Sequence, residues 1–182
     1  MLLSIPAKWL PPILCSQLTP NSKRPTLTSP MSTEGHISVL LIDSNDIERN
    51  YYVDRLKQYS SDYIVHEAAT GEFGLAIYEA QPIDCVVLEF NLADMSGFEV
   101  LVRLVPIARQ PDVPVIVLTH LSNHYLADLA LMNGAFACLL KTDTAGDALD
   151  KMIQKAISVF ARDRKKAHHY STLPEEIKEG LT

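Results

Sequence analysis

Residues 38–42 read SVLLI, an apolar run that ends directly before Asp43, and this run decides the fold. A strand with one face in water alternates apolar and polar residues, whereas the four residues after Ser38 are all apolar. It therefore predicts a strand in the middle of a sheet, covered on both faces. Four further strands are predicted at residues 63–67, 84–88, 114–118 and 136–140.

Segments with helical spacing separate these strands, and such alternation is typical of a parallel sheet. The predicted helices are residues 46–59, residues 72–80 after a cap at Thr70, and three more that begin near Ser96, Ser122 and Thr144. The sequence thus predicts an α/β fold, a doubly wound five-stranded parallel sheet with five helices in a flavodoxin-like layout.

The 182 residues suffice for one domain with a buried core, which we place at residues 36–162. Residues 1–35 contain many prolines, serines and threonines and are predicted to be a disordered leader, within which Met31 is a candidate for the true start of translation. Prolines interrupt the apolar N-terminal residues, so a signal peptide is not indicated. The polar residues 163–182 form a predicted tail, too short for a DNA-binding output domain.

The composition excludes several classes of partner. A net charge of −6 gives no basic surface, so no nucleic acid is expected to bind. No apolar run approaches the roughly 20 residues of a membrane span, so no membrane contact is expected. Three cysteines form no disulfide framework and indicate a reducing, cytoplasmic location. His66, His124, His168 and His169 lack the spacing of zinc ligands.

Polar residues follow the predicted strands at the ends where a parallel sheet places its chemistry. They are Asp43, Ser44, Glu89, Thr119 and Lys141. Carboxylates of this kind hold a divalent cation, and a hydroxyl with an ammonium group binds phosphoryl oxygens. The set therefore suits a phosphoryl group together with a metal ion.

From about residue 37 to residue 160 the chain resembles the receiver domains of response regulators. Residues 40–44 are similar to the family's first strand with its acidic pair, and residues 84–97 to the stretch that carries the phosphoacceptor. Residues 114–119 resemble the strand that ends in the switch hydroxyl, and residues 134–141 the segment that ends in the family's lysine. The resemblance implies a receiver-type signalling module, not an enzyme, that binds a histidine kinase or a downstream signalling protein.

Two departures from the family concern the phosphoacceptor and the metal. Glu89 stands where the family carries aspartate, and an error of about 1 Å in placing a nucleophile costs roughly a hundredfold in rate. Ser44 replaces the second acid, so a metal would find Asp43, Glu89 and the carbonyl of Asn91. We therefore expect weak Mg²⁺ binding and no other cofactor.

Three more departures surround the switch. Thr119 and Lys141 are retained, but Cys138 takes the position of the switch aromatic residue. His120 stands where the family prefers a small residue and is expected to narrow the access to the site. Thr142 replaces the usual proline after the lysine, so a trans peptide is expected there.

Three functions stay open at this point. The first is an atypical receiver that binds a protein through the fourth helix, fifth strand and fifth helix, with a Glu89–Lys141 salt bridge that imitates a phosphorylated aspartate; a plain structural ion pair is the rival interpretation. The second is a receiver phosphorylated on Glu89 or Asp94 with Mg²⁺. The third is a flavodoxin-like cofactor binder, although the turn at residues 43–46 is acidic. Partner and oligomeric state stay open.

Overall fold

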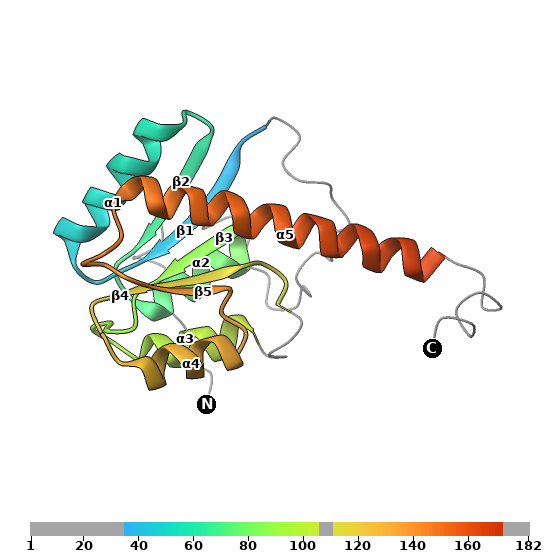
Figure 1. Ribbon diagram of the computed structural model, residues 1–182. Helices are drawn as coiled ribbons and strands as arrows, with labels where there is room; N and C mark the ends of the chain where they lie inside the picture. The colour runs from blue at the N-terminus through green and yellow to red at the C-terminus, as the bar shows by residue number, and fades with distance from the viewer. Residues whose placement is uncertain (1–34, 106–110, 173–182) are drawn as a thin grey trace. The chain divides into compact units, whose positions relative to one another are not determined.

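A computed structural model of the protein describes residues 35–105 and 111–172 (Figure 1). The predicted leader up to residue 34, with Met31, lies outside the described residues. The end of the predicted tail, from residue 173 onward, lies outside them as well.

Five parallel strands form one sheet in the order β2-β1-β3-β4-β5, which confirms the predicted fold class. The strands are β1 (Ile37–Ile42), β2 (Tyr63–Ala68), β3 (Cys85–Leu88), β4 (Val115–Thr119) and β5 (Ala137–Leu140). Each predicted strand is present, with its ends displaced by no more than one residue. The run that decides the fold lies between β2 and β3, and its side chains are buried as predicted.

Helices cover both faces of this sheet, as Figure 1 shows. They are α1 (Asp46–Tyr59), α2 (Gly71–Ala80), α3 (Gly97–Leu104), α4 (His124–Met132) and α5 (Gly146–Thr172). The helix α5 runs past the predicted domain boundary at residue 162. No helix within residues 35–105 and 111–172 is long and apolar enough to cross a membrane.

The alternation of side chains along the strands divides the core into two halves. Leu40 and Ile42 of β1 face α2, α3 and α4, whereas Val39 and Leu41 face α1 and α5. Because successive strand residues point to opposite faces, each apolar strand fills both halves at once. This burial fixes the strand register and brings the polar residues after the strands to one edge.

Local capping residues set where the helices begin. The side chains of Thr70 and Ser96 accept hydrogen bonds from amides in the first turns of α2 and α3, as predicted. The prediction of Ser122 as the cap of α4 is wrong, because Asn123 caps this helix instead. Asparagine caps helices as well as serine does, so the sequence alone does not separate these neighbours.

Gly97 provides a test of how tightly α3 packs on the end of β3. A Cβ atom at this position would lie 2.6 Å from Cα of Phe90 and would also meet the carbonyl oxygen of Glu89. Backbone atoms cannot move aside as a side chain can, so Gly97→Ala is expected to destabilise the protein by about 1–3 kcal/mol in urea unfolding. Gly71→Ala is the control, because its Cβ would meet only side chains among its nearest atoms. An equal loss in both variants would contradict this account.

Candidate functional site

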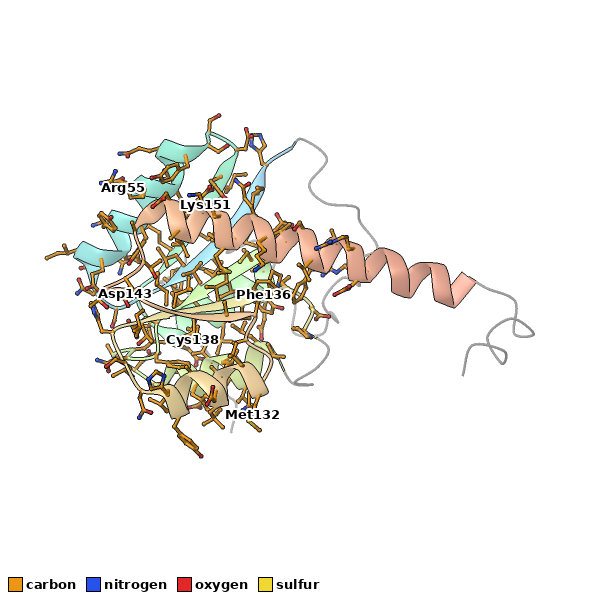
Figure 2. The ribbon with its side chains drawn as sticks, viewed as in Figure 1. Arg55, Met132, Phe136, Cys138, Asp143 and Lys151 are labelled. Atoms are coloured by element: carbon orange, nitrogen blue, oxygen red, sulfur yellow. The ribbon has the colours of Figure 1, made fainter. Side chains whose placement is uncertain are left out.

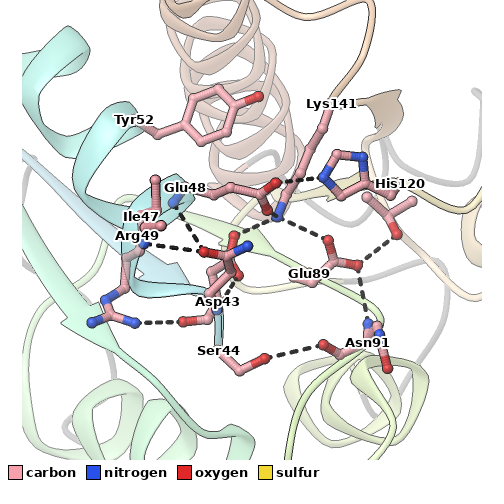
Figure 3. A network of polar contacts seen from close by, with 12 residues as sticks. Asp43, Ser44, Ile47, Glu48, Arg49, Tyr52, Glu89, Asn91, His120 and Lys141 are labelled. Carbon is pink, nitrogen blue, oxygen red and sulfur yellow. Dashed lines mark hydrogen bonds and ion pairs between the residues drawn. The ribbon is translucent and has the colours of Figure 1, made fainter.

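The carboxyl ends of β1, β3, β4 and β5 meet at one edge of the sheet and bring together four of the predicted site residues (Figure 3). Asp43, Glu89 and Lys141 each follow a strand directly, and Thr119 ends β4. All four are buried, with exposed fractions between 1% and 9%. Three of these residues, Asp43, Glu89 and Lys141, carry charged groups. Because a buried charge is costly without a partner, these groups must pair with one another or with their neighbours.

The ammonium group of Lys141 lies at the centre of the site. Its Nζ lies 2.5 Å from Asp43 Oδ2, 2.6 Å from Glu48 Oε2 and 2.9 Å from Glu89 Oε2. Burial lowers the pKa of Lys141, but the hydrogen bonds to these three carboxylates outweigh it and raise that pKa well above its ordinary value. Lys141 is therefore a permanent cation bound on three sides.

Both carboxylate oxygens of Glu89 are occupied by groups of the protein. Oε1 accepts hydrogen bonds from Thr119 Oγ1 at 2.5 Å and from the amide of Asn91 at 3.0 Å. Oε2 pairs with Lys141. The hydroxyl and the ammonium group that were predicted to bind phosphoryl oxygens thus bind the Glu89 side chain.

The predicted metal ligands are likewise bonded within the protein. Asp43 accepts from the amide of Asn45 at 2.9 Å through the oxygen that Lys141 does not bind. Ser44 Oγ donates to the carbonyl of Asn91 at 3.2 Å. The oxygens of Asp43 and Asn91 that were predicted to bind magnesium thus already accept hydrogen bonds from groups of the protein. In the described part of the chain, no three His, Cys, Asp or Glu side chains are arranged to hold a metal ion.

Glu48 belongs to the site although the sequence reasoning missed it. It lies in the first turn of α1, and its Oε1 lies 2.5 Å from His120 Nε2 while its Oε2 binds Lys141. Burial raises the pKa of Glu48, but its hydrogen bonds to Lys141 and His120 prevail and lower it. The sequence does show an acidic residue, Glu48, in the first turn of the helix that follows β1. Its side chain points back toward the end of β1 and so reaches Lys141.

A cavity of about 150 Å³ opens at this edge, and His120 stands on its rim. The His120 side chain is 54% exposed and leans on Glu48, where Figure 3 shows the two joined. The cavity is lined by Asp43, Ser44, Asn45, Glu48, Glu89, Asn91, Thr119, His120, Leu121 and Lys141. The carboxylates of Asp43, Glu48 and Glu89 in this lining are all bonded to Lys141.

Asp94 does not belong to the residues that line this cavity. Its two carboxylate oxygens accept hydrogen bonds from the amides of Gly71 at 2.9 Å and Glu72 at 3.0 Å. Burial raises the pKa of Asp94, but the backbone hydrogen bonds prevail and lower it. Asp94 thus ties the loop after β3 to the positive end of α2, a structural task that engages both possible acceptor oxygens.

Cys138 lies half-buried on β5, beside the site. Burial raises the pKa of its thiol, and the negative charge of Glu89 raises it further. A raised pKa favours the protonated thiol over the reactive thiolate. The peptide after Lys141 is trans, as predicted, since no cis peptide occurs in the described ranges.

A family profile described as the response regulator receiver domain matches residues 39–154. The chain belongs to this family. Relatives include the response regulator GacA of Pseudomonas aeruginosa, 27% identical over 70% of this chain, and the nitrate/nitrite response regulator NarL of Escherichia coli, 30% identical over 69%. The match covers 57% of each of these two proteins, so the receiver domain spans little more than half of their length.

Solved structures give the same assignment of the fold. A CheY-like receiver domain from Methanospirillum hungatei matches with a TM-score of 0.62 at 22% identity, over 70% of this chain and 98% of its own. A receiver domain protein from Clostridium thermocellum matches with a TM-score of 0.59 at 27% identity, over 72% and 98%. The protein is thus a receiver domain of two-component signalling, and the roles of its site residues remain predictions.

Lys141→Met tests how far the site depends on its central cation. The substitution leaves three carboxylates side by side without a counter-ion, and the removal of one partner from a buried ion pair costs about 3–5 kcal/mol. We expect a loss of that size at neutral pH in urea unfolding. Protonation of the carboxylates relieves their repulsion, so the deficit relative to wild type should shrink as the pH falls to about 5.

Lys151→Met is the matched control for this substitution. Lys151 is 76% exposed and pairs with Asp147 at 3.3 Å one turn away on α5, a contact worth at most a few tenths of a kcal/mol. Equal losses in the two variants, or a Lys141→Met deficit that does not change with pH, would show that the ammonium is not what balances the site.

Proposed function

We propose that this protein is an atypical receiver, not an enzyme, that signals by binding a partner protein without aspartyl phosphorylation. Its signalling conformation is held by the contacts of Glu89 with Thr119 and Lys141. The observation that carries the proposal is that one glutamate carboxylate binds both the hydroxyl, at 2.5 Å, and the ammonium, at 2.9 Å. Those are the groups that a phosphoryl group on an aspartate would engage.

The longer side chain at position 89 accounts for this arrangement. A glutamate carboxylate extends one methylene further from β3 than an aspartate carboxylate, so it reaches Thr119 and Lys141 directly. The same reach fills the space in which a phosphodonor would approach, and a nucleophile displaced by about 1 Å loses roughly a hundredfold in rate. The contacts of Glu89 with Thr119 and Lys141 need neither a phosphodonor nor magnesium.

The partner is proposed to bind across α4, β5 and α5. Tyr125 and Met132 on the outer side of α4 are 72% and 75% exposed, and Leu121 before the helix is 43% exposed. Figure 2 shows Met132 on α4, and Phe136 and Cys138 above it near the edge strand β5. Every residue of β5 is only half-buried. We name Leu121, Tyr125 and Met132 the α4 surface, and exposed apolar side chains of this kind are typical of protein contacts.

Glu89→Asp tests whether the site is silenced by one methylene. After incubation with a small acyl phosphate and Mg²⁺, the intact mass of wild type is expected to stay unchanged, whereas Glu89→Asp gains one phosphoryl group. The shorter acid leaves room for the donor between itself and Lys141. Ser44→Asp added to Glu89→Asp should accelerate the gain, because it supplies the missing acid for magnesium.

Glu89→Gln is the control in this experiment, since it keeps the shape of the side chain but has no nucleophilic carboxylate. A phosphoryl gain by the wild type that Glu89→Gln abolishes would overturn the proposal. It would establish the second function considered, a receiver phosphorylated on glutamate.

The α4 surface is tested with purified histidine kinases from the source genome. Tyr125→Ser and Met132→Ser are expected to weaken the binding of a kinase partner at least about fivefold, because truncation of a side chain that anchors an interface costs more than about 1 kcal/mol. Ile47→Ser is the matched control, since Ile47 is 82% exposed but lies on α1. Loss of binding in Ile47→Ser alone would move the contact to α1.

A further inference from the structure

The loop between β4 and α4, residues 120–123, links the site to the α4 surface. Two side-chain bonds hold it on the side of the site. The amide of Leu121 donates to Thr119 Oγ1 at 3.2 Å, and that hydroxyl is itself bonded to Glu89. His120 binds Glu48 Oε1. The side chains of all four loop residues are exposed, so these bonds rather than core packing fix the path of the loop.

Glu48 joins this loop to a second segment of the chain. One of its oxygens binds His120, at the start of the loop, and the other binds Lys141, directly after β5. Both contacts are hydrogen bonds to a carboxylate, and such charge-assisted bonds are roughly twice as strong as neutral ones. A single side chain from α1 thus bridges the segments that lead into α4 and α5.

The first turn of α1 holds Glu48 in a fixed position. Asn45 accepts hydrogen bonds from the amides of Ile47 and Glu48 and so caps the helix. Arg49, the next residue, donates to the carbonyl of Asp43 at 2.8 Å and also pairs with Asp46. The backbone around Glu48 is therefore anchored to the end of β1, so that its carboxylate stays aimed at the site.

We infer that Glu48 and His120 are positioning residues that hold the loop, and through it the α4 surface, in the arrangement that binds a partner. Their bond holds His120, whereas the Thr119 hydroxyl that contacts Glu89 holds the amide of Leu121. This inference rests on the proposed function, and it names which residues regulate the same surface. The pair would hold the loop at residues 120–123 without a phosphoryl group or a metal ion.

Amide hydrogen exchange in the full chain measures this directly. We expect His120→Ala and Glu48→Gln to accelerate exchange at residues 121–125 by roughly tenfold, because local opening of the loop then breaks one bond fewer. His120→Lys should return the rates toward those of wild type, since its ammonium group also reaches Glu48. Glu99→Gln is the control, because it removes an exposed ion pair on α3 in which Glu99 lies 2.6 Å from Arg103. It should leave the exchange rates at residues 121–125 unchanged.

Two results would overturn the inference. One is exchange at residues 121–125 in His120→Ala that equals wild type. The other is a failure of His120→Lys to restore the exchange rates at residues 121–125. The faster exchange in His120→Ala would then come from the lost bulk of the side chain and not from the lost bond to Glu48. The proposed function fails on a different measurement, a phosphoryl gain by the wild type. The mass measurement and the exchange measurement are independent, so the two proposals can fail separately.

Discussion

The buried ammonium group of Lys141 is the interaction on which the rest of the site depends. A cation with a side chain only 3% exposed is stable only where carboxylates replace its lost hydration, and Asp43, Glu48 and Glu89 do so within 2.9 Å. These acids come from the end of β1, the first turn of α1 and the end of β3. In the strand order β2-β1-β3-β4-β5, β4 lies between β5 and the strands β3 and β1. The side chain of Lys141 therefore reaches past the end of β4 to pair with Glu89 and Asp43.

The departures from the family compensate one another. Ser44 removes one acid from the pair that follows β1, and Glu48 supplies an acid from one turn further along the chain. The extra methylene at Glu89 removes the gap that a phosphoryl group would fill, and Thr119 closes onto the same carboxylate. The carboxylates of Asp43, Glu48 and Glu89 and the ammonium group of Lys141 thereby satisfy one another.

The sequence predicted the sheet well because apolar runs and strand ends are local properties. The residues directly after the strands were also predictable, since parallel strands bring their carboxyl ends to one edge. Glu48 was missed because its membership depends on the direction in which α1 leaves the site, and no local pattern encodes that direction. The choice of Asn123 over Ser122 as a cap failed for a similar reason, since both side chains can accept the bond and tertiary packing selects one.

The described contacts connect the site to the α4 surface through the backbone. Cys138 is too small to carry a movement of Thr119 outward in the manner of an aromatic ring, and its thiol stays half-buried on β5. The hydroxyl of Thr119 instead accepts a hydrogen bond from the amide of Leu121 and donates one to Glu89. Through this hydroxyl, the carboxylate of Glu89 sets the position of the start of the loop that leads into α4. Because that carboxylate directly follows β3 and contacts both Thr119 and Lys141, its contacts favour one arrangement of the loop. Under the proposed function, this receiver would present its α4 surface continuously rather than switch it.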